Sequence, residues 1–465
     1  MVSGRRLAAS AVLLGSLPYW LPGTVVRLRT RVFAEVNGEE GVTFPNATLG
    51  PDRFVEVYGH PGAAGRSKGA ALSDLFWYWL APGSEVHQEH LEPGPRYQEV
   101  AAATARVLAG PGEELARAAA HRTAAALDRA VPGRARLVRL RDLMMPVWAE
   151  FFYELVFREP CPPDARRLIV GHADDVVSSL KCTRLRHMAR RHALTRYLRR
   201  RIAAGDVPAD ALPRGLSERE QAYYLQGTFF NTAVVQMSEA MAHLLLVLAR
   251  HRDVQRRLAD RPDDEAYLSQ VMNETFRLYP LFGVAHRIAT EDIALPDAPV
   301  IPAGSVLCFS YPDYHASGYR DPEAFRPERW RLLKTKEAHF IPFGVAANRP
   351  CPAWRLAPLA MRAATREVLR RFTLDSPVTH TRSLPHRGPC LLVRRGSRLP
   401  RGGRAAVRAF LRVRDRWEDV WRAPVQLALG TWMVLDARRR RPAQRYFATH
   451  DTEGRPTACP VRHAP

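Results

Sequence analysis

The stretch of sequence that decides the fold is Pro342-Phe343-Gly344-Val345-Ala346-Ala347-Asn348-Arg349-Pro350-Cys351-Pro352-Ala353. It sets one cysteine between two prolines, with an arginine two residues before it, and a helical pattern follows as far as Arg371. A cysteine at the positive end of a helix and near arginines gains ionised character, which favours metal ligation. A lone cysteine is nevertheless more often a small core hydrophobe, so this motif needs support from the rest of the chain.

Two other motifs precede it in the chain. Glu274-Thr275-Phe276-Arg277 puts a carboxylate and a guanidinium three residues apart on one helix face, where they can pair. Phe325-Arg326-Pro327-Glu328-Arg329-Trp330 supplies a second arginine, Arg329, whose rigid fork can share that carboxylate. Each motif alone is weak, because such pairs are usually surface salt bridges. Their order and spacing between residues 274 and 353 give them weight together.

In this order the motifs resemble the cytochrome P-450 (P450) superfamily, the heme-thiolate monooxygenases, from about Gly215 to Val393. The resemblance implies a heme b cofactor whose iron takes its axial thiolate from Cys351, with Phe343 packed near the ligand loop. It also implies that Arg349 and Arg287 pair with the heme propionates.

Other residues receive roles from the same resemblance. A buried network that locks the core behind the heme would consist of Glu274, Arg277 and Arg329. His315 is either a further propionate contact or a surface histidine with partners of its own. His90 and Arg96 are placed near the other edge of the heme.

The ligand loop departs from the family pattern. Phe343 stands eight residues before the cysteine instead of seven, and Ala347 and Ala353 replace the usual glycines. We therefore expect a different backbone around the ligand, and strain at the alanines if those sites need a positive φ, for which the extra residue would compensate.

The central helix departs further. Ser217 and Glu220 form a capping-box pattern, and the apolar pattern predicts one long helix from about Glu220 to His251. The family's acid and alcohol, which relay protons, fall on Val235 and Gln236. Val235 cannot deliver a proton. Gln236, which can hold a water, is one remaining candidate for a catalytic role. Thr232 and Asn231, one turn earlier, are candidates for a shifted relay or for substrate binding.

Substrate contacts are assigned only as candidates, with ordinary core packing as the equal alternative. They are Phe229, Phe230, Val234 and Val235 on the central helix and residues 281–284 after the Glu-Arg helix.

The wider pattern predicts a mostly helical protein with a small β region (α+β), in which one large domain of the P450 fold places a long central helix over the heme. The expected parts are an N-terminal arm (1–40), the heme-binding domain (41–400) and a basic C-terminal extension (401–465). The clearest further elements are a helix at 263–278 and strands at 287–290, 306–309, 372–374 and 390–393.

Composition limits the function classes. The 465 residues are 46% hydrophobic and carry a net charge of +22, which excludes a disordered polar chain. The sequence has no basic stripe with interleaved aromatics and no zinc-finger pattern, so we expect no nucleic-acid partner. Six scattered cysteines without a C-x-x-C pair predict a reducing, cytoplasmic setting.

Both ends of the chain differ from its middle. The apolar run Leu7–Leu17 is interrupted by Pro18 and is shorter than the ~20 residues that span a bilayer. It predicts a packed or membrane-resting arm in preference to a cleaved signal peptide. Residues 401–465 hold 14 basic and 6 acidic residues, and the amphipathic stretch Phe410–Leu435 predicts a surface helix or a docking segment.

Three functions remain open. The first is a monooxygenase of bacterial specialised metabolism that oxidises a hydrophobic small molecule with electrons from a ferredoxin and ferredoxin reductase-type donor. The second is a heme-thiolate enzyme that uses peroxide or rearranges a pre-oxidised substrate, because the usual proton relay is missing. The third is a non-catalytic scaffold, against which the retained cysteine and arginines argue. The sequence also leaves open a peripheral contact of the protein with a membrane.

Overall fold

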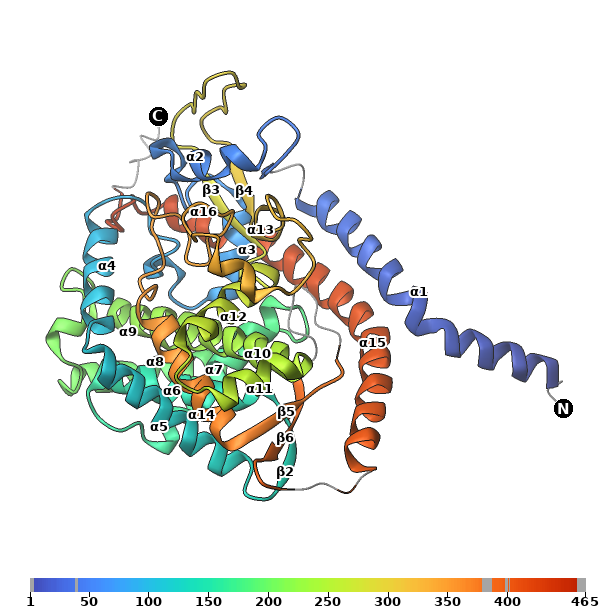
Figure 1. The fold of residues 1–465 in the computed structure, drawn as a ribbon. Coiled ribbons are helices and arrows are strands. Elements are labelled where there is room, and N and C mark those ends of the chain that lie inside the picture. Colours follow the sequence, from blue (N-terminus) through green and yellow to red (C-terminus); the bar gives the residue numbers. More distant parts are fainter. Residues whose placement is uncertain (1–3, 38–40, 379–386, 398–399, 401, 458–465) are drawn as a thin grey trace, which may run out of the picture.

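The computed structural model describes residues 4–37, 41–378, 387–397, 400 and 402–457, so that Cys459 lies outside the described residues. The fold is mostly helical with two small sheets, as the sequence predicts (Figure 1). The α-helices are α1 (Gly4–Asn37), α2 (Phe54–Gly59), α3 (Ala71–Leu80), α4 (Pro95–Leu108), α5 (Gly112–Ala130), α6 (Leu140–Phe157), α7 (Pro163–Leu180), α8 (Met188–Ala203), α9 (Glu218–Gly227), α10 (Val234–Arg250), α11 (Arg252–Asp260), α12 (Glu265–Leu278), α13 (Tyr311–Ala316), α14 (Leu356–Arg371), α15 (Gly403–Arg440) and α16 (Pro442–Phe447).

The strands form two sheets of three. β1 (Val42–Phe44) runs parallel to β4 (Val306–Ser310), which pairs antiparallel with β3 (Val284–Ile288) so that Arg287 lies opposite Leu307. The second sheet has the antiparallel order β2 (Ala135–Arg139), β6 (Pro389–Arg394) and β5 (Phe372–Asp375). The strand expected at 287–290 begins three residues earlier and ends at Ile288.

The central helix is continuous from Glu218 to Arg250, but it is not α-helical throughout. A π-helical segment, Thr228–Ala233, separates α9 from α10. The predicted capping box is present, since Ser217 Oγ accepts from the Glu220 N–H and the Glu220 carboxylate accepts from the Ser217 N–H. Among the described residues, this stretch alone has the length and hydropathy of a membrane-crossing helix, and 83% of its apolar 18-residue window is buried in the protein. It is therefore the core helix around which α6, α12 and α14 pack.

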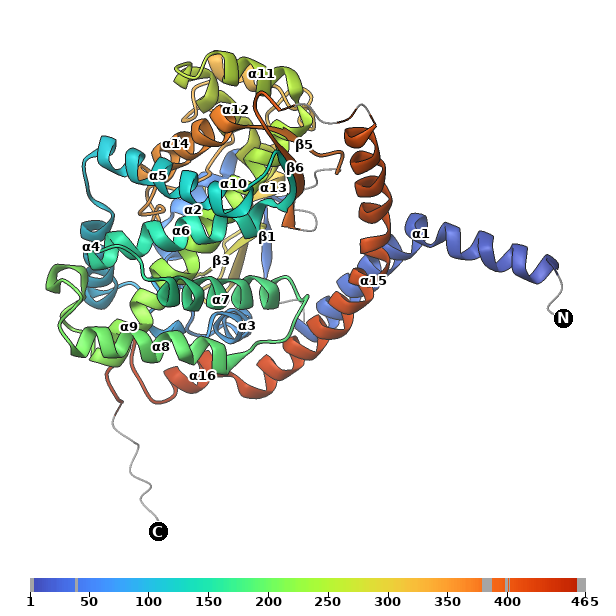
Figure 2. The same cartoon turned by 90° about the horizontal axis from the view of Figure 1, so that it is seen from below.

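The N-terminal helix α1 and the C-terminal helix α15 lie side by side. α1 continues through Pro18 and Pro22, because a proline removes one N–H and an exposed helix can leave the freed carbonyl to solvent. α15 packs along α1 and then against α3, and α16 also contacts α3. The first half of α1 leads away from the rest of the protein (Figures 1 and 2).

Candidate active site

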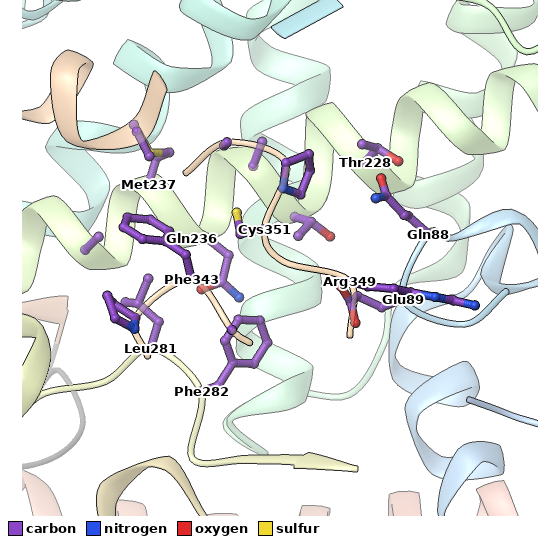
Figure 3. Close-up of a pocket in the computed structure, with 18 of the residues that line it drawn as sticks. Gln88, Glu89, Thr228, Gln236, Met237, Leu281, Phe282, Phe343, Arg349 and Cys351 are labelled. Carbon is purple, nitrogen blue, oxygen red and sulfur yellow. The ribbon is translucent and has the colours of Figure 1, made fainter. Parts of the chain in front are cut away.

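One large cavity lies between the central helix and the loop that carries Cys351 (Figure 3). The loop contributes Phe343, Arg349 and Cys351, and the segment before α4 contributes residues 87–89. The central helix lines the cavity with Thr228, Phe229, Thr232, Ala233, Gln236, Met237 and Ala240. Leu281 and Phe282 close another side, so most of the wall is apolar.

The cysteine loop is fixed by backbone hydrogen bonds. The Cys351 N–H donates to the Phe343 carbonyl (2.8 Å), and the Gly344 N–H donates to the Ile341 carbonyl (3.0 Å). Positive φ angles occur at Gly344 (+77°) and Arg349 (+56°) and at neither Ala347 nor Ala353. The expected strain at the alanines is therefore absent, and the left-handed residue of the longer loop is Arg349.

The protein around Cys351 favours a neutral thiol. Burial raises the pKa of Cys351 to about 11, which differs from the ionised sulfur that the sequence predicts. A backbone hydrogen bond from Ala353 lowers the pKa, but the effect of burial is larger. α14 begins only at Leu356, and the Arg349 side chain donates to the Leu91 carbonyl (Nη1 to O, 2.6 Å).

A buried ionic network lies behind this loop. The Glu274 carboxylate, which is fully buried, accepts two hydrogen bonds from Arg277 (2.9 and 3.0 Å) and one from Arg329 Nε (3.1 Å). Trp330 Nε1 (2.9 Å) and the Arg326 N–H (2.9 Å) complete its shell. The structure thus brings the three predicted residues together and adds two donors that the sequence did not single out.

Three arginines gather at one end of the cavity around Glu89. Arg66 and Arg287 are buried, and Arg66 Nη1 lies 3.7 Å from the Glu89 carboxylate. Burial, and then repulsion from Arg287, lower the pKa of Arg66 to about 9. Although burial opposes it, Arg66, Arg287 and Arg349 lower the pKa of Glu89. In the part of the chain that the structure describes, Nε and Nη1 of Arg66 and Nε of Arg287 have no hydrogen-bond partner. The cluster holds an uncompensated positive charge.

The π-helical segment determines which side chains of the central helix reach the cavity. Phe229, Thr232 and Gln236 line it, whereas Phe230, Val234 and Val235 do not. Phe230 packs instead on Tyr153 and Phe157. For those three side chains the structure therefore favours the alternative of ordinary core packing, because a π turn adds a residue and shifts the phase of the helix.

Comparison with known proteins identifies the family. The profile described as Cytochrome P450 matches residues 214–398. Cytochrome P450 3A13 of Mus musculus is 32% identical over 158 residues, which are 30% of this chain and 31% of that protein. The profile match, the curated relatives and the shared fold together support the cytochrome P450 superfamily as the family of this chain. The aligned segment covers about a third of the length of the curated relatives, for example 31% of the mouse protein.

Solved P450 structures share the fold at low sequence identity. A 6-coordinated cytochrome P450 from Thermus thermophilus has a TM-score of 0.57 and 21% identity, covering 73% of this chain and 90% of that one. A variant of cytochrome P450 OleT in complex with arachidonic acid has a TM-score of 0.59 and 16% identity, covering 70% of this chain and 83% of that one. These likenesses extend the shared fold beyond the segment that the profile matches.

The cofactor of this superfamily is heme with iron bound by a cysteine thiolate. The cavity fits that group, because Cys351 lines one wall and three arginines gather near only two carboxylates, Glu89 and Glu92. Propionates would add negative charge beside these arginines and would give partners to the unsatisfied atoms of Arg66 and Arg287. A bound metal cation deprotonates a coordinating thiol, which offsets the raised pKa of Cys351.

Three other predicted residues lie elsewhere. His315 does not line the cavity and is not on the surface, since it is fully buried and its Nε2 accepts the Ile341 N–H (3.0 Å). It ties α13 to the segment before the cysteine loop. His90 is buried beside His87 but does not line the cavity. Arg96 is held by Glu220 and by Tyr446 and Glu453 of the C-terminal segment.

Sequence reasoning missed Arg66, His87 and Glu89. Arg66 Nη2 donates to Asn348 Oδ1 (2.6 Å), and these residues are 282 positions apart. His87 Nε2 lies 2.8 Å from Thr232 Oγ1 across the cavity wall. No local sequence pattern indicates the role of such residues, because their functional contacts join segments that are far apart in the chain.

Proposed function

We propose that this P450 is a monooxygenase that oxidises a hydrophobic small molecule with electrons from a ferredoxin-type donor. The observation that supports it is a largely apolar cavity with Cys351 in its wall. Heme on a cysteine thiolate supplies O–O bond cleavage when electrons and dioxygen are provided. Phe229, Met237 and Leu281 would hold an apolar substrate and exclude water from this side. The arachidonic acid bound by OleT is a long apolar acid, and such acids belong in the first substrate panel.

We infer that Thr232 provides the proton on the substrate side. His87 Nδ1 accepts the Glu89 N–H (3.3 Å), so the ring proton is on Nε2 and is donated to Thr232 Oγ1. Burial lowers the pKa of His87, which keeps the ring neutral in this tautomer. The hydroxyl hydrogen of Thr232 is then available to a group in the cavity. Gln236 lines the same wall and can hold a water but cannot act as an acid.

We also infer that the donor docks near the cysteine loop. Trp354 is 49% exposed, and the guanidinium of Arg355 lies 4.5 Å from its ring centre. Both residues follow Cys351 closely, and a cationic surface there favours an acidic donor. Arg355→Glu should raise the donor concentration needed for half-maximal rate without changing peroxide-supported turnover.

The test supplies the holoprotein and an apolar substrate panel with either a ferredoxin and its reductase or hydrogen peroxide. We expect turnover with electrons and dioxygen, and about a hundredfold less coupled turnover in Thr232→Val. Thr228→Val is the matched control, since Thr228 also lines the cavity but its hydroxyl has no hydrogen-bond partner within the described structure. Unchanged coupling in Thr232→Val would contradict the proton assignment.

A second candidate function is a peroxide-using enzyme. It is favoured by the central helix, where Val235 is turned away and Gln236 takes the place of the usual alcohol. Turnover with peroxide and none with electrons and dioxygen would establish it and would exclude the monooxygenase.

A further inference from the structure

The outward face of α15 is apolar along most of its length. Six large side chains there are exposed: Phe410 58%, Val413 59%, Trp417 42%, Trp421 56%, Trp432 60% and Leu435 51%. Their spacing keeps them on one side of a helix with about 3.6 residues per turn, over about 38 Å. We call these six residues the α15 stripe. Single exposed hydrophobic residues are normal, but a contiguous patch marks an interaction surface.

The charge beside the α15 stripe is positive. α15 carries nine arginines and four acidic residues. Glu418, Asp419 and Asp436 each pair with an arginine of the same helix. Arg412 and Arg416 are exposed beside the stripe. Just beyond Leu435, at the bend into α16, a shallow hollow is lined by Arg438, Arg439, Arg441 and Arg445.

The first half of α1 adds a second apolar surface at the same place. Arg416 Nη1 donates to the Tyr19 hydroxyl (2.8 Å), so α1 leaves α15 close to Trp417. Beyond this point α1 extends away from the body (Figure 2). Three consecutive residues, Val12, Leu13 and Leu14, are 73%, 60% and 57% exposed, so this turn presents apolar side chains to its surroundings.

We propose that the α15 stripe docks on a membrane that contains anionic lipids. Tryptophan side chains favour the interfacial layer, and arginines beside them contact lipid phosphates while their stems cover apolar surface. The apolar turn Val12–Leu14 of α1 enters the acyl region next to the stripe. A second copy of the chain is a poor occupant, because two arginine-rich faces would repel each other. This inference does not depend on the reaction proposed above.

The test is flotation of the full-length holoprotein with phosphatidylcholine vesicles, with and without phosphatidylglycerol. We expect binding to the anionic vesicles that weakens as salt is added, because salt screens the arginines. The triple variant Trp417→Ser, Trp421→Ser and Trp432→Ser should bind the anionic vesicles at least about tenfold more weakly than the unmodified protein does. The control replaces three exposed apolar residues of the body, Val55 (40%), Val300 (53%) and Leu332 (83%), by serine and should bind as the unmodified protein does.

A charge variant tests the proposal without removing apolar surface. Arg412→Glu with Arg439→Glu should lose the preference for anionic vesicles and keep the heme spectrum of a folded protein. The proposal is overturned if the unmodified protein does not float, or if the triple variant floats equally well. A dimer in light scattering that the triple variant loses, in protein that does not float, would identify a second copy as the occupant.

Discussion

The Glu274 carboxylate lies at the centre of the structural network behind the heme cavity. It is fully buried and accepts hydrogen bonds from Arg277, Arg326, Arg329 and Trp330. Burying ions is unfavourable unless each is paired and hydrogen-bonded, so this group stabilises the fold only as a complete set.

Glu274→Gln is expected to lower the free energy of unfolding of the holoprotein by about 3–5 kcal/mol, because Arg277 would stay buried without its counter-charge. Denaturant unfolding followed by the heme spectrum measures it. The matched control is Arg326→Gln, whose side chain pairs with Asp321 while both are about half exposed (57% and 49%). That change should alter stability by less than about 1 kcal/mol. Equal effects of the two changes would contradict the assignment.

At the scale of single residues, the sequence predicts contacts between residues that belong to recognisable local motifs. Glu274 and Arg277 are one helix turn apart and Arg329 stands in a recognisable loop, so their association could be expected. The role of Arg66 in the charged cluster could not be expected, because its proximity to Arg287 and Glu89 depends on the whole fold. The raised pKa of the Cys351 thiol shows the same limit, since the neighbouring residues in the sequence do not reveal how far the thiol is removed from solvent.

At the scale of elements, the sequence pattern predicts well where the helices lie along the chain. It does not predict which side chains of the central helix face the cavity. The central helix, α12 and the strands β4 and β5 lie close to their predicted ranges. The π-helical segment Thr228–Ala233 leaves no clear mark in the sequence, and it moves Val235 out of the cavity.

Helix α15 allows a comparison of two adjacent residues with opposite roles. Met433 is fully buried against Leu75 and Tyr78 of α3, whereas Trp432 is 60% exposed. Met433→Ala should lower the thermodynamic stability by about 2–5 kcal/mol without a direct effect on vesicle binding. Trp432→Ala should weaken vesicle binding and leave stability within about 0.5 kcal/mol. Thermal unfolding and flotation of both variants check this, and a reversed pattern would contradict the placement of α15.

At the scale of the whole molecule, buried neutral histidines link stability to pH. Burial lowers the pKa of both His172 and His315 to about 3, far below the value of about 6.5 in an unfolded chain. Below pH 6.5 the unfolded chain therefore binds protons that the folded protein does not, and stability falls as the pH falls.

Each such histidine should remove about 2 kcal/mol between pH 7 and pH 5. His315→Gln keeps an acceptor for the Ile341 N–H but does not titrate, so it should flatten the fall in unfolding free energy over this range. Urea titrations at several pH values measure the slope. An unchanged slope would show that His315 is protonated in the folded protein.

The central claim is that Cys351 ligates a heme iron in this cavity. The most direct test is the absorption spectrum of the reduced, carbon monoxide-bound protein, compared with Cys351→Ser. We predict a thiolate-type Soret band in the unmodified protein and its loss in the variant. A well-folded protein that binds no heme, or a thiolate band that persists in Cys351→Ser, would contradict the claim.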